Sequence, residues 1–199
     1  MPESSSSPSG WAKRSRWTAR AVLAAAASVA TTAGCGVLSF DPTSEVQEDL
    51  TVSSPVLVDG EPIPDRFTCH GEGVSPPLQW SGFPSETESI AIVMDTPEAR
   101  GGTAVQWIVF DLDPEGQEIT EGQPGSPAAE ATNSLGDVGY EPPCPESDSD
   151  DGEEYRFTVY ALSDTVGLGE GADFNEATDT IADRVLAYGR LIATGQQPS

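Results

Sequence analysis

Residues 94–110, "MDTPEARGGTAVQWIVF", are predicted to form a strand, a turn and a second strand. A hydrophobic run ends at Asp95, a turn containing Pro and Gly follows, and a second hydrophobic run begins at about Ala104. Both runs are apolar at successive positions, which is typical of strands covered on both faces. We therefore expect two buried strands whose ends, at Asp95 and near Gln106, frame a ligand pocket.

Similar short runs on both sides of this stretch indicate a mostly β domain. They are LTVSSPVLV (50–58), ESIAIVMD (88–95), AVQWIVFDL (104–112) and EYRFTVYAL (154–162), each followed by turn residues. In the last run, Tyr155 and Phe157 share one face and Arg156 and Thr158 the other, because side chains alternate along a strand. A chain of 199 residues with 37% hydrophobic content buries one substantial core.

The clearest helical pattern comes late in the chain. It begins at about Asn175, which is a suitable N-cap, and runs to about Thr194, just before Gly195. Its apolar stripe consists of Ala177, Ile181, Val185, Tyr188 and Ile192. We expect a C-terminal helix of this extent at the periphery of the β domain.

Charge is distributed very unevenly along the chain. The formal net charge is −24, yet four of the nine basic residues lie in the first 20 positions, where Glu3 is the only acid. After Cys35 there are five arginines, no lysine and 32 acidic residues, a net charge of about −27. Such a surface repels nucleic acid, so we exclude a nucleic-acid partner. Dense carboxylates without lysine suit a solvent of high ionic strength and favour a halophilic source; an acidic secreted protein is the alternative.

The N-terminus has the pattern of a lipoprotein signal peptide. A basic polar region precedes an apolar stretch over residues 21–34, which is too short to span a bilayer comfortably. Small residues stand directly before Cys35, as in a lipobox. We predict a signal peptide over residues 1–34, lipidation of Cys35 and a tether over residues 35–50. Residues 51–196 would then form a domain outside the cytoplasm, anchored to the cytoplasmic membrane. An ordinary signal peptide and a buried Ala-rich helix are the alternatives.

Two further cysteines, Cys69 and Cys144, are expected to form a disulfide outside the cytosol. The bond would join the loop after Phe67 to the loop after Tyr140. It would close about 75 residues, which stabilises a fold by about 2–5 kcal/mol. Two buried free thiols are the alternative.

Most motifs that carry catalysis or hold cofactors are missing from the sequence. One histidine and these cysteines supply no CxxC or HxxxH pair for zinc. A Ser-His-Asp triad would have to use His70, and no GxSxG motif is present. The glycines of residues 167–173 follow no βαβ unit, and residues 148–154 are better explained as an acidic surface loop than as a calcium loop. We therefore expect no enzymatic activity, no cofactor and no bound metal.

Five segments occur in a specific order along the chain. They are FTCHGEGVSPPLQWSGFP (67–84), SIAIVMDTPEA (89–99), VQWIVFDL (105–112), GYEPPCP (139–145) and EEYRFTVYAL (153–162). Together they resemble the phosphatidylethanolamine-binding protein family, in particular its prokaryotic Raf-kinase-inhibitor-like branch, over about residues 50–196. That branch reads YTCDGxNxSPPLxWxGxP, DDPDAP, HWxxYxI, GYxGPCPP and HRYxFxLYAL. The resemblance implies a central antiparallel sheet with a smaller sheet on one side, helices on the other, and a small anion pocket at the strand ends.

The resemblance also implies which residues line that pocket. In the family, the first Asp of DPDAP, two histidines, the proline of the GP loop and a tyrosine surround a phosphate, an acetate or a similar anion. The matching positions in this chain are assigned to Asp95, Gln106, Pro143, Glu153 and Tyr155, and His70 stands at the Asp of TCDG. Gln106 and Glu153 thus replace the two histidines.

Replacing two imidazoles by an amide and a carboxylate changes the kind of ligand expected. Gln106 keeps an amide donor, whereas an ionised Glu153 supplies acceptors and a negative charge. One added like charge at about 4 Å costs about 4 kcal/mol at an effective dielectric near 20, or about three decades of affinity. Three possibilities stay open: an empty scaffold, a site for a neutral or cationic small molecule, or a site where His70 restores anion or metal contacts. An exposed loop histidine is the simpler interpretation of His70.

We expect a non-enzymatic, lipid-anchored protein that binds a small molecule or lipid headgroup in an altered pocket. The alternative is a protein-interaction module, resembling relatives that inhibit kinases or proteases, which uses surface loops and keeps a vestigial pocket. A hydrolase is disfavoured because the sequence offers no evident pair of base and nucleophile.

Overall fold

The structure is a computed structural model that describes residues 46, 49–97, 99, 102–125, 128–144 and 153–195. The chain divides into two units, Met1–Gly36 and Val37–Ser199, and all described residues belong to the second. The predicted signal peptide, Cys35 and most of the predicted tether lie outside the described residues, as does most of the predicted acidic loop. No helix in the described part of the chain has the length and apolarity needed to cross a membrane.

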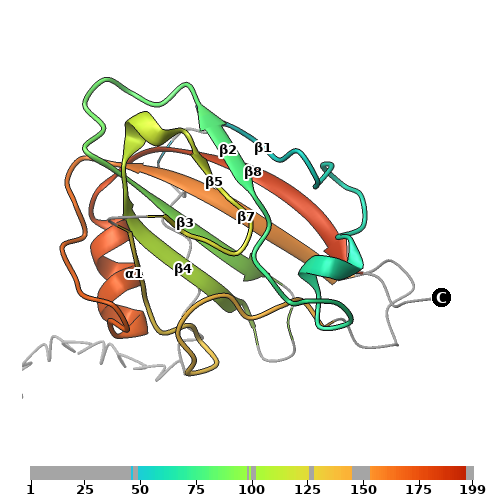
Figure 1. Ribbon diagram of the computed structural model, residues 1–199. Coiled ribbons are helices and arrows are strands. Elements are labelled where there is room, and N and C mark those ends of the chain that lie inside the picture. The colour runs from blue at the N-terminus through green and yellow to red at the C-terminus, as the bar shows by residue number, and fades with distance from the viewer. Residues whose placement is uncertain are drawn as a thin grey trace, which may run out of the picture. The chain divides into compact units, whose positions relative to one another are not determined.

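Two antiparallel sheets dominate the domain (Figure 1), as predicted. The larger sheet has five strands in the order β6-β4-β3-β7-β8, and the smaller has three in the order β1-β2-β5. The strands are β1 (Thr51–Ser53), β2 (Leu78–Ser81), β3 (Ser89–Thr96), β4 (Ala104–Leu112), β5 (Glu118–Ile119), β6 (Ala129–Glu130), β7 (Glu153–Leu162) and β8 (Val185–Gly195). The helices of the described residues are α1 (Phe174–Ala182) and the short 3₁₀ helices η1 (Asp65–Phe67) and η2 (Pro114–Gly116). The expected mostly β fold with a late helix is confirmed.

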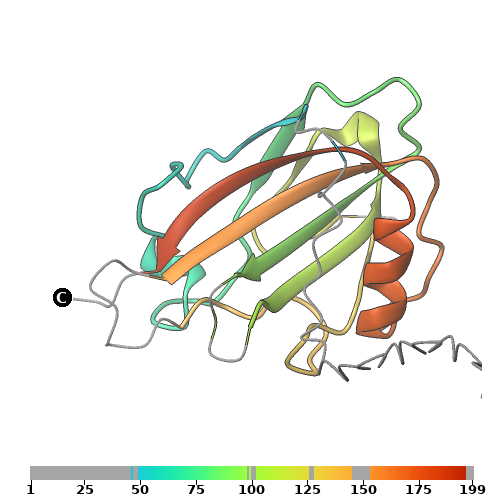
Figure 2. The ribbon, with the colours of Figure 1, turned by 180° about the vertical axis from the view of Figure 1, so that it is seen from behind.

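The central strand β3 is buried along its whole length. Successive side chains of β3 belong alternately to two hydrophobic clusters, because neighbouring side chains of a strand point to opposite faces. Met94 belongs to the cluster that also contains Leu78 of the smaller sheet, here called the small-sheet cluster. Val93 belongs to the cluster that also contains Ile181 of α1, here called the α1 cluster. Figure 2 shows α1 against one end of the larger sheet.

The prediction of one helix over residues 175–194 is wrong in its second half. α1 ends at Ala182, and β8 begins at Val185. From Ala187 onward every second residue of β8 is buried, which is the period of a strand and not that of a helix. The helical stripe therefore holds only within α1, and the remaining apolar residues face one side or the other of the larger sheet.

Two predicted boundaries also differ from the structure. Of the run over residues 50–58, only Thr51–Ser53 form a strand, because the Ser54 hydroxyl accepts hydrogen bonds from backbone N–H groups that follow it and closes a turn. The N-cap of α1 is Asp173, whose carboxylate accepts a hydrogen bond from the backbone N–H of Asn175, the residue predicted to be the cap.

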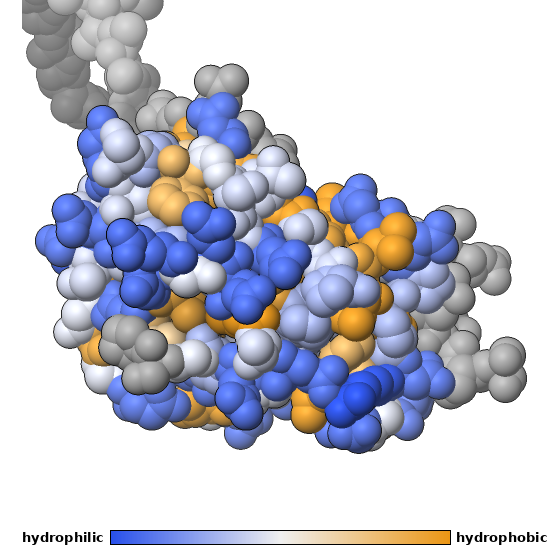
Figure 3. Space-filling model, turned by 45° about the horizontal axis from the view of Figure 1, so that its top comes forward, coloured by the Kyte–Doolittle hydropathy of each residue, from blue (hydrophilic) through white to orange (hydrophobic). Residues whose placement is uncertain are grey.

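The face shown in Figure 3 is covered largely by hydrophilic residues, with smaller hydrophobic groups between them. Among the described residues, the most exposed large hydrophobic side chains are Val58 at 63% and Leu135 at 57%. Leu135 belongs to the segment that closes one side of the candidate site.

Candidate functional site

A cavity of about 190 Å³ lies where three strands of the larger sheet meet the segment before Cys144. β3 and β4 reach this cavity at the ends joined by their connecting turn, and β7 reaches it with its first residues. The described lining residues are Thr96, Ala99, Ala104, Gln106, Leu135, Glu141, Pro142, Cys144, Glu153 and Tyr155. The cavity therefore lies at the strand ends, which is where the sequence places a pocket.

A β-bulge brings Gln106 to the cavity. Met94 of β3 pairs with Trp107 of β4. The next residue of β3, Asp95, pairs with Val105, which leaves Gln106 as an extra residue in β4. Trp107 lies in the small-sheet cluster and Val105 in the α1 cluster, although they are two positions apart. The regular alternation is thus broken at Gln106, and its side chain is free to point into the cavity.

Gln106 is held by Thr96 across the end of the sheet. The Thr96 hydroxyl donates to Gln106 Oε1 at 2.8 Å, and both residues are buried. The backbone oxygen of Gln106 accepts from the backbone N–H of Glu141 at 3.0 Å, which ties the cavity wall to the bulge. No hydrogen bond among the described residues uses Gln106 Nε2, so this amide nitrogen remains as a donor for a ligand.

Glu153 and Tyr155 form a second polar part of the lining. They are two residues apart in β7, so they project from the same face. The Tyr155 hydroxyl donates to Glu153 Oε2 at 2.7 Å. Burial raises the pKa of Tyr155 far above its ordinary value, and the hydrogen bond to Glu153 and the charge of that carboxylate raise it further. The phenol therefore stays protonated, and its O–H group donates a hydrogen bond to Glu153 rather than to a ligand.

The predicted disulfide is confirmed and closes the third wall. Cys69 and Cys144 are bonded, with their Cα atoms 5.3 Å apart. The backbone N–H of Cys69 donates to the Pro143 oxygen at 2.9 Å, and the Tyr140 hydroxyl donates to the Phe67 oxygen at 2.8 Å. Since Cys144 lines the cavity, the disulfide fixes this wall against the loop that follows η1.

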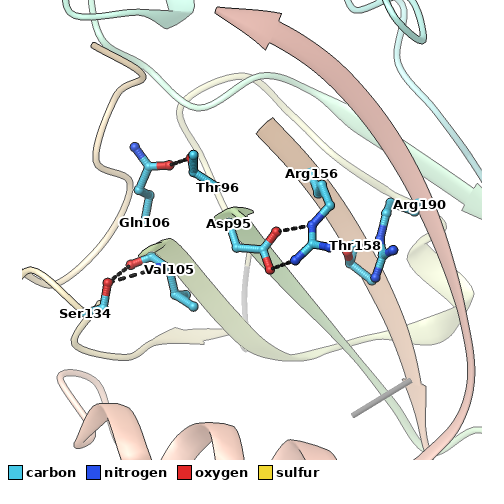
Figure 4. Close-up of polar contacts among 8 residues, drawn as sticks. All are labelled: Asp95, Thr96, Val105, Gln106, Ser134, Arg156, Thr158 and Arg190. Atoms are coloured by element: carbon cyan, nitrogen blue, oxygen red, sulfur yellow. Dashed lines mark hydrogen bonds and ion pairs between the residues drawn. The ribbon is translucent and has the colours of Figure 1, made fainter. Parts of the chain in front are cut away.

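Of the six residues predicted to bind a ligand, Gln106, Glu153 and Tyr155 line the cavity and Asp95 does not. Asp95 lies on the α1 face of β3, where its two carboxylate oxygens each accept a hydrogen bond of 2.6 Å from Arg156. Figure 4 shows Asp95 directed toward Arg156 and Thr96 directed toward Gln106. The assignment of Asp95 to the pocket needs correction, because the alternation of β3 turns Thr96, and not Asp95, to the cavity.

The other two predicted residues, Pro143 and His70, also lie outside the cavity lining. Pro143 is buried, and its carbonyl accepts from Cys69 as described. His70 is exposed, and its backbone N–H donates to the Thr68 hydroxyl in a turn. The structure therefore does not bring His70 to the cavity, and His70 has the position of an ordinary loop histidine.

Sequence reasoning missed two polar lining residues, Thr96 and Glu141. Thr96 had a usable signal: placing Pro97 on the proline of DDPDAP puts Thr96 at the first Asp of DPDAP and Asp95 one position earlier. Glu141 had none, because it stands at the variable position of GYxGPCPP. In the described part of the chain, no group of three or more His, Cys, Asp or Glu side chains is arranged to hold a metal ion.

Comparisons with known proteins agree with the geometry. The sequence model of the family described as phosphatidylethanolamine-binding protein matches residues 53–196. A Mycobacterium tuberculosis protein named "Putative lipoprotein LppC" is 39% identical over 147 residues, which cover 74% of this chain and 72% of that protein.

Two crystal structures are similar in fold. A phosphatidylethanolamine-binding protein homologue from Chlamydia trachomatis matches with a TM-score of 0.68 and 28% identity, covering 76% of this chain and all of that one. YbcL of Escherichia coli matches with a TM-score of 0.70 and 20% identity, covering 75% of this chain and 99% of that one.

Proposed function

Because the chain belongs to the phosphatidylethanolamine-binding protein family, we propose that it is a non-enzymatic protein that binds a small ligand in the cavity at the strand ends. Its cavity is altered so that anions are disfavoured. The protein is held at the outer face of the cytoplasmic membrane by lipid on Cys35.

One observation carries the altered selectivity: nearly all polar groups of the cavity present acceptors. The Tyr155 hydroxyl donates its hydrogen bond to Glu153 and the Thr96 hydroxyl donates its own to Gln106. Glu141 and Glu153 add two carboxylates, and no Lys, Arg or His is among the described lining residues. A phosphate needs donors and positive charge, and among the described lining residues Gln106 Nε2 is the one side-chain donor that remains.

The same groups argue against catalysis. The hydroxyl of Thr96 donates to a neutral amide and not to a base, and Cys144 is bound in a disulfide. A nucleophile needs an adjacent base to be activated at neutral pH. Tyr155 is paired with the Glu153 carboxylate, but its raised pKa keeps the phenol in its un-ionised form. The described lining residues therefore offer a partly open binding surface and no Ser, Thr or Cys side chain paired with a base.

Three observations support the lipid anchor: the lipobox before Cys35, the extracytoplasmic character of a disulfide, and the lipoprotein name of the mycobacterial relative. Replacing the thiol in Cys35→Ser removes the lipid attachment point. We expect this variant to leave the membrane fraction of cells that process lipoproteins or to remain as an uncleaved precursor, whereas the unaltered chain gains the mass of its acyl chains. An unaltered chain recovered unacylated would exclude the anchor.

Calorimetry with inorganic phosphate tests the selectivity, using the full chain in detergent. Glu153 places a like charge beside the anion, a cost of about 4 kcal/mol at about 4 Å and an effective dielectric near 20. We expect no phosphate binding tighter than about 10 mM, and a gain of about 100-fold or more in Gln106→His/Glu153→His, which restores two imidazoles. Micromolar binding of phosphate by the unaltered chain would overturn the proposal.

A further inference from the structure

We propose that the ligand of this cavity is a short alkyl molecule with a protonated primary amine, which the cavity prefers over a quaternary ammonium of equal charge and size. The inference rests on the proposed function and names the chemical class of its ligand. It depends on three properties of the cavity: its charge, the direction of its hydrogen bonds, and its size with the apolar part of its lining.

The charge favours a cation. Glu141 and Glu153 stand on different walls, one in the segment tied to the disulfide and one at the start of β7. Both are partly buried, so water screens them less than it screens carboxylates on the open surface. A cation placed between them meets two negative groups, and no basic side chain among the described lining residues competes for them.

The hydrogen-bond directions favour N–H donors on the ligand. Glu153 uses Oε2 to accept from Tyr155, and no hydrogen bond among the described residues uses its second carboxylate oxygen. The Thr96 hydroxyl donates its hydrogen bond to Gln106, so the lone pairs of its oxygen remain to accept a hydrogen bond from a ligand. A primary ammonium carries three donors and no acceptor, and it therefore complements a site that consists mainly of acceptors.

A quaternary ammonium fits this site less well. It has no N–H group and is recognised by the faces of several aromatic rings. Tyr155 is the one aromatic residue among the described lining residues, and its hydroxyl is engaged with Glu153. The cavity thus offers hydrogen-bond acceptors in place of an aromatic cage.

Size and the apolar lining set the length of the ligand. The cavity volume of about 190 Å³ is below the range of about 300–1,000 Å³ that is usual for ligand pockets, which suits a molecule smaller than a drug-sized ligand. Ala99, Ala104, Leu135 and Pro142 supply the apolar part of the lining. They match a short carbon chain attached to the amine.

Two isomeric cations test the inference. Butylammonium and tetramethylammonium have the same formula and charge, and only the first has N–H donors. Calorimetry on the full chain in detergent, at fixed low salt, should show butylammonium binding at least ten-fold tighter than tetramethylammonium or neutral butanol. Equal binding of the two cations would overturn this inference and leave the proposed function standing, and tighter binding of phosphate than of either cation would overturn both.

Paired variants locate the binding. Glu153→Gln keeps the shape and removes the charge, and we expect at least a ten-fold loss of butylammonium affinity. Glu154→Gln is the matched control, because Glu154 is the next residue of β7, is exposed and projects from the other face. It should stay within two-fold of the unaltered chain. Equal losses in both variants, or no loss in Glu153→Gln with an unchanged melting temperature, would contradict the inference.

Discussion

Asp95 and Thr96 are adjacent in β3 but serve different parts of the molecule. Thr96 orients the amide of Gln106 at the cavity, while Asp95 forms an ion pair with Arg156 on the opposite face of the sheet. The Asp95 and Arg156 side chains are 8% and 16% exposed. Both oxygens of the carboxylate are matched by guanidinium nitrogens, so this pair has the bidentate geometry in which a largely buried charge is satisfied.

Arg156→Met should therefore affect stability and leave the cavity unchanged. The variant leaves the Asp95 carboxylate buried without its partner, which costs about 3–5 kcal/mol. Urea denaturation at neutral pH should show a loss of this size, with butylammonium affinity unchanged. Asp95→Asn/Arg156→Met removes both charges, and its loss should be smaller than the sum of the two single losses. A loss below about 1 kcal/mol in Arg156→Met would show that the pair contributes little.

At this scale, sequence reasoning succeeds where the strand is regular and fails where it is not. Glu153 and Tyr155 could be predicted together because both stand in one family motif, and β7 alternates without interruption at their positions. Asp95 was misassigned by one position, since every side chain of a strand changes face with a shift of one residue. The bulge at Gln106 depends on how β3 and β4 pair, and no local pattern in β4 predicts it.

Among the elements, β8 illustrates how tertiary pairing overrides a local pattern. Apolar residues at Ala177, Ile181, Val185, Tyr188 and Ile192 have helical spacing, but β8 pairs with β7 along its length. Ala187 and Leu191 face the small-sheet cluster. The competing strand period was present in the sequence, but small residues at the buried positions made it weak. The presence of a helix in this part of the chain could be predicted, whereas the change from helix α1 to strand β8 could not.

The main chain at Leu50 packs closely against Gly189 of β8, and a substitution at Gly189 tests this packing. A methyl group at Gly189 would overlap the carbonyl oxygen of Leu50, which crosses the edge of β8 at this point. We expect Gly189→Ala to lower the free energy of unfolding by about 1–3 kcal/mol through overpacking. Gly169→Ala is the control, because nothing lies within 4 Å of the added methyl group. Equal unfolding midpoints for the two variants would show that Leu50 moves aside at no cost.

The disulfide links the loop that follows η1 to the wall of the cavity. Replacing both partners in Cys69→Ser/Cys144→Ser should lower the free energy of unfolding by about 2–5 kcal/mol. Because Cys144 lines the cavity, we also expect weaker butylammonium binding at temperatures where the variant is fully folded. Thermal unfolding measures the loss of stability, and titration calorimetry on the folded variant measures the loss of affinity. Unchanged affinity in the folded variant would mean that the hydrogen bond from Cys69 to Pro143 is enough to position the wall.

For the whole molecule, the family motifs predicted more than composition or periodicity. Local patterns identified most of the long strands, but the order β6-β4-β3-β7-β8 arises from contacts between distant segments. The order of five motifs along the chain predicted the two antiparallel sheets, but not which strands are neighbours. Neither source indicated the direction of the hydrogen bonds inside the cavity. The Thr96–Gln106 bond joins two different strands, and the Tyr155–Glu153 bond depends on the side-chain conformations of two residues in β7.

The net charge of about −27 after Cys35 leads to a prediction for the entire domain. Acidic groups repel one another in the folded state, and salt weakens this repulsion because the Debye length falls from about 10 Å at 0.1 M to about 3 Å at 1 M. We expect the melting temperature to rise by about 5 °C or more between 0.1 and 1 M KCl and then to level off. Butylammonium affinity should fall over the same range, because the same screening weakens the carboxylates of the cavity. Sodium sulfate is the control, since a preferentially excluded anion keeps raising stability above 1 M. A melting temperature that stays flat or falls in KCl would contradict the expectation of a protein adapted to high salt and would favour an ordinary acidic secreted domain.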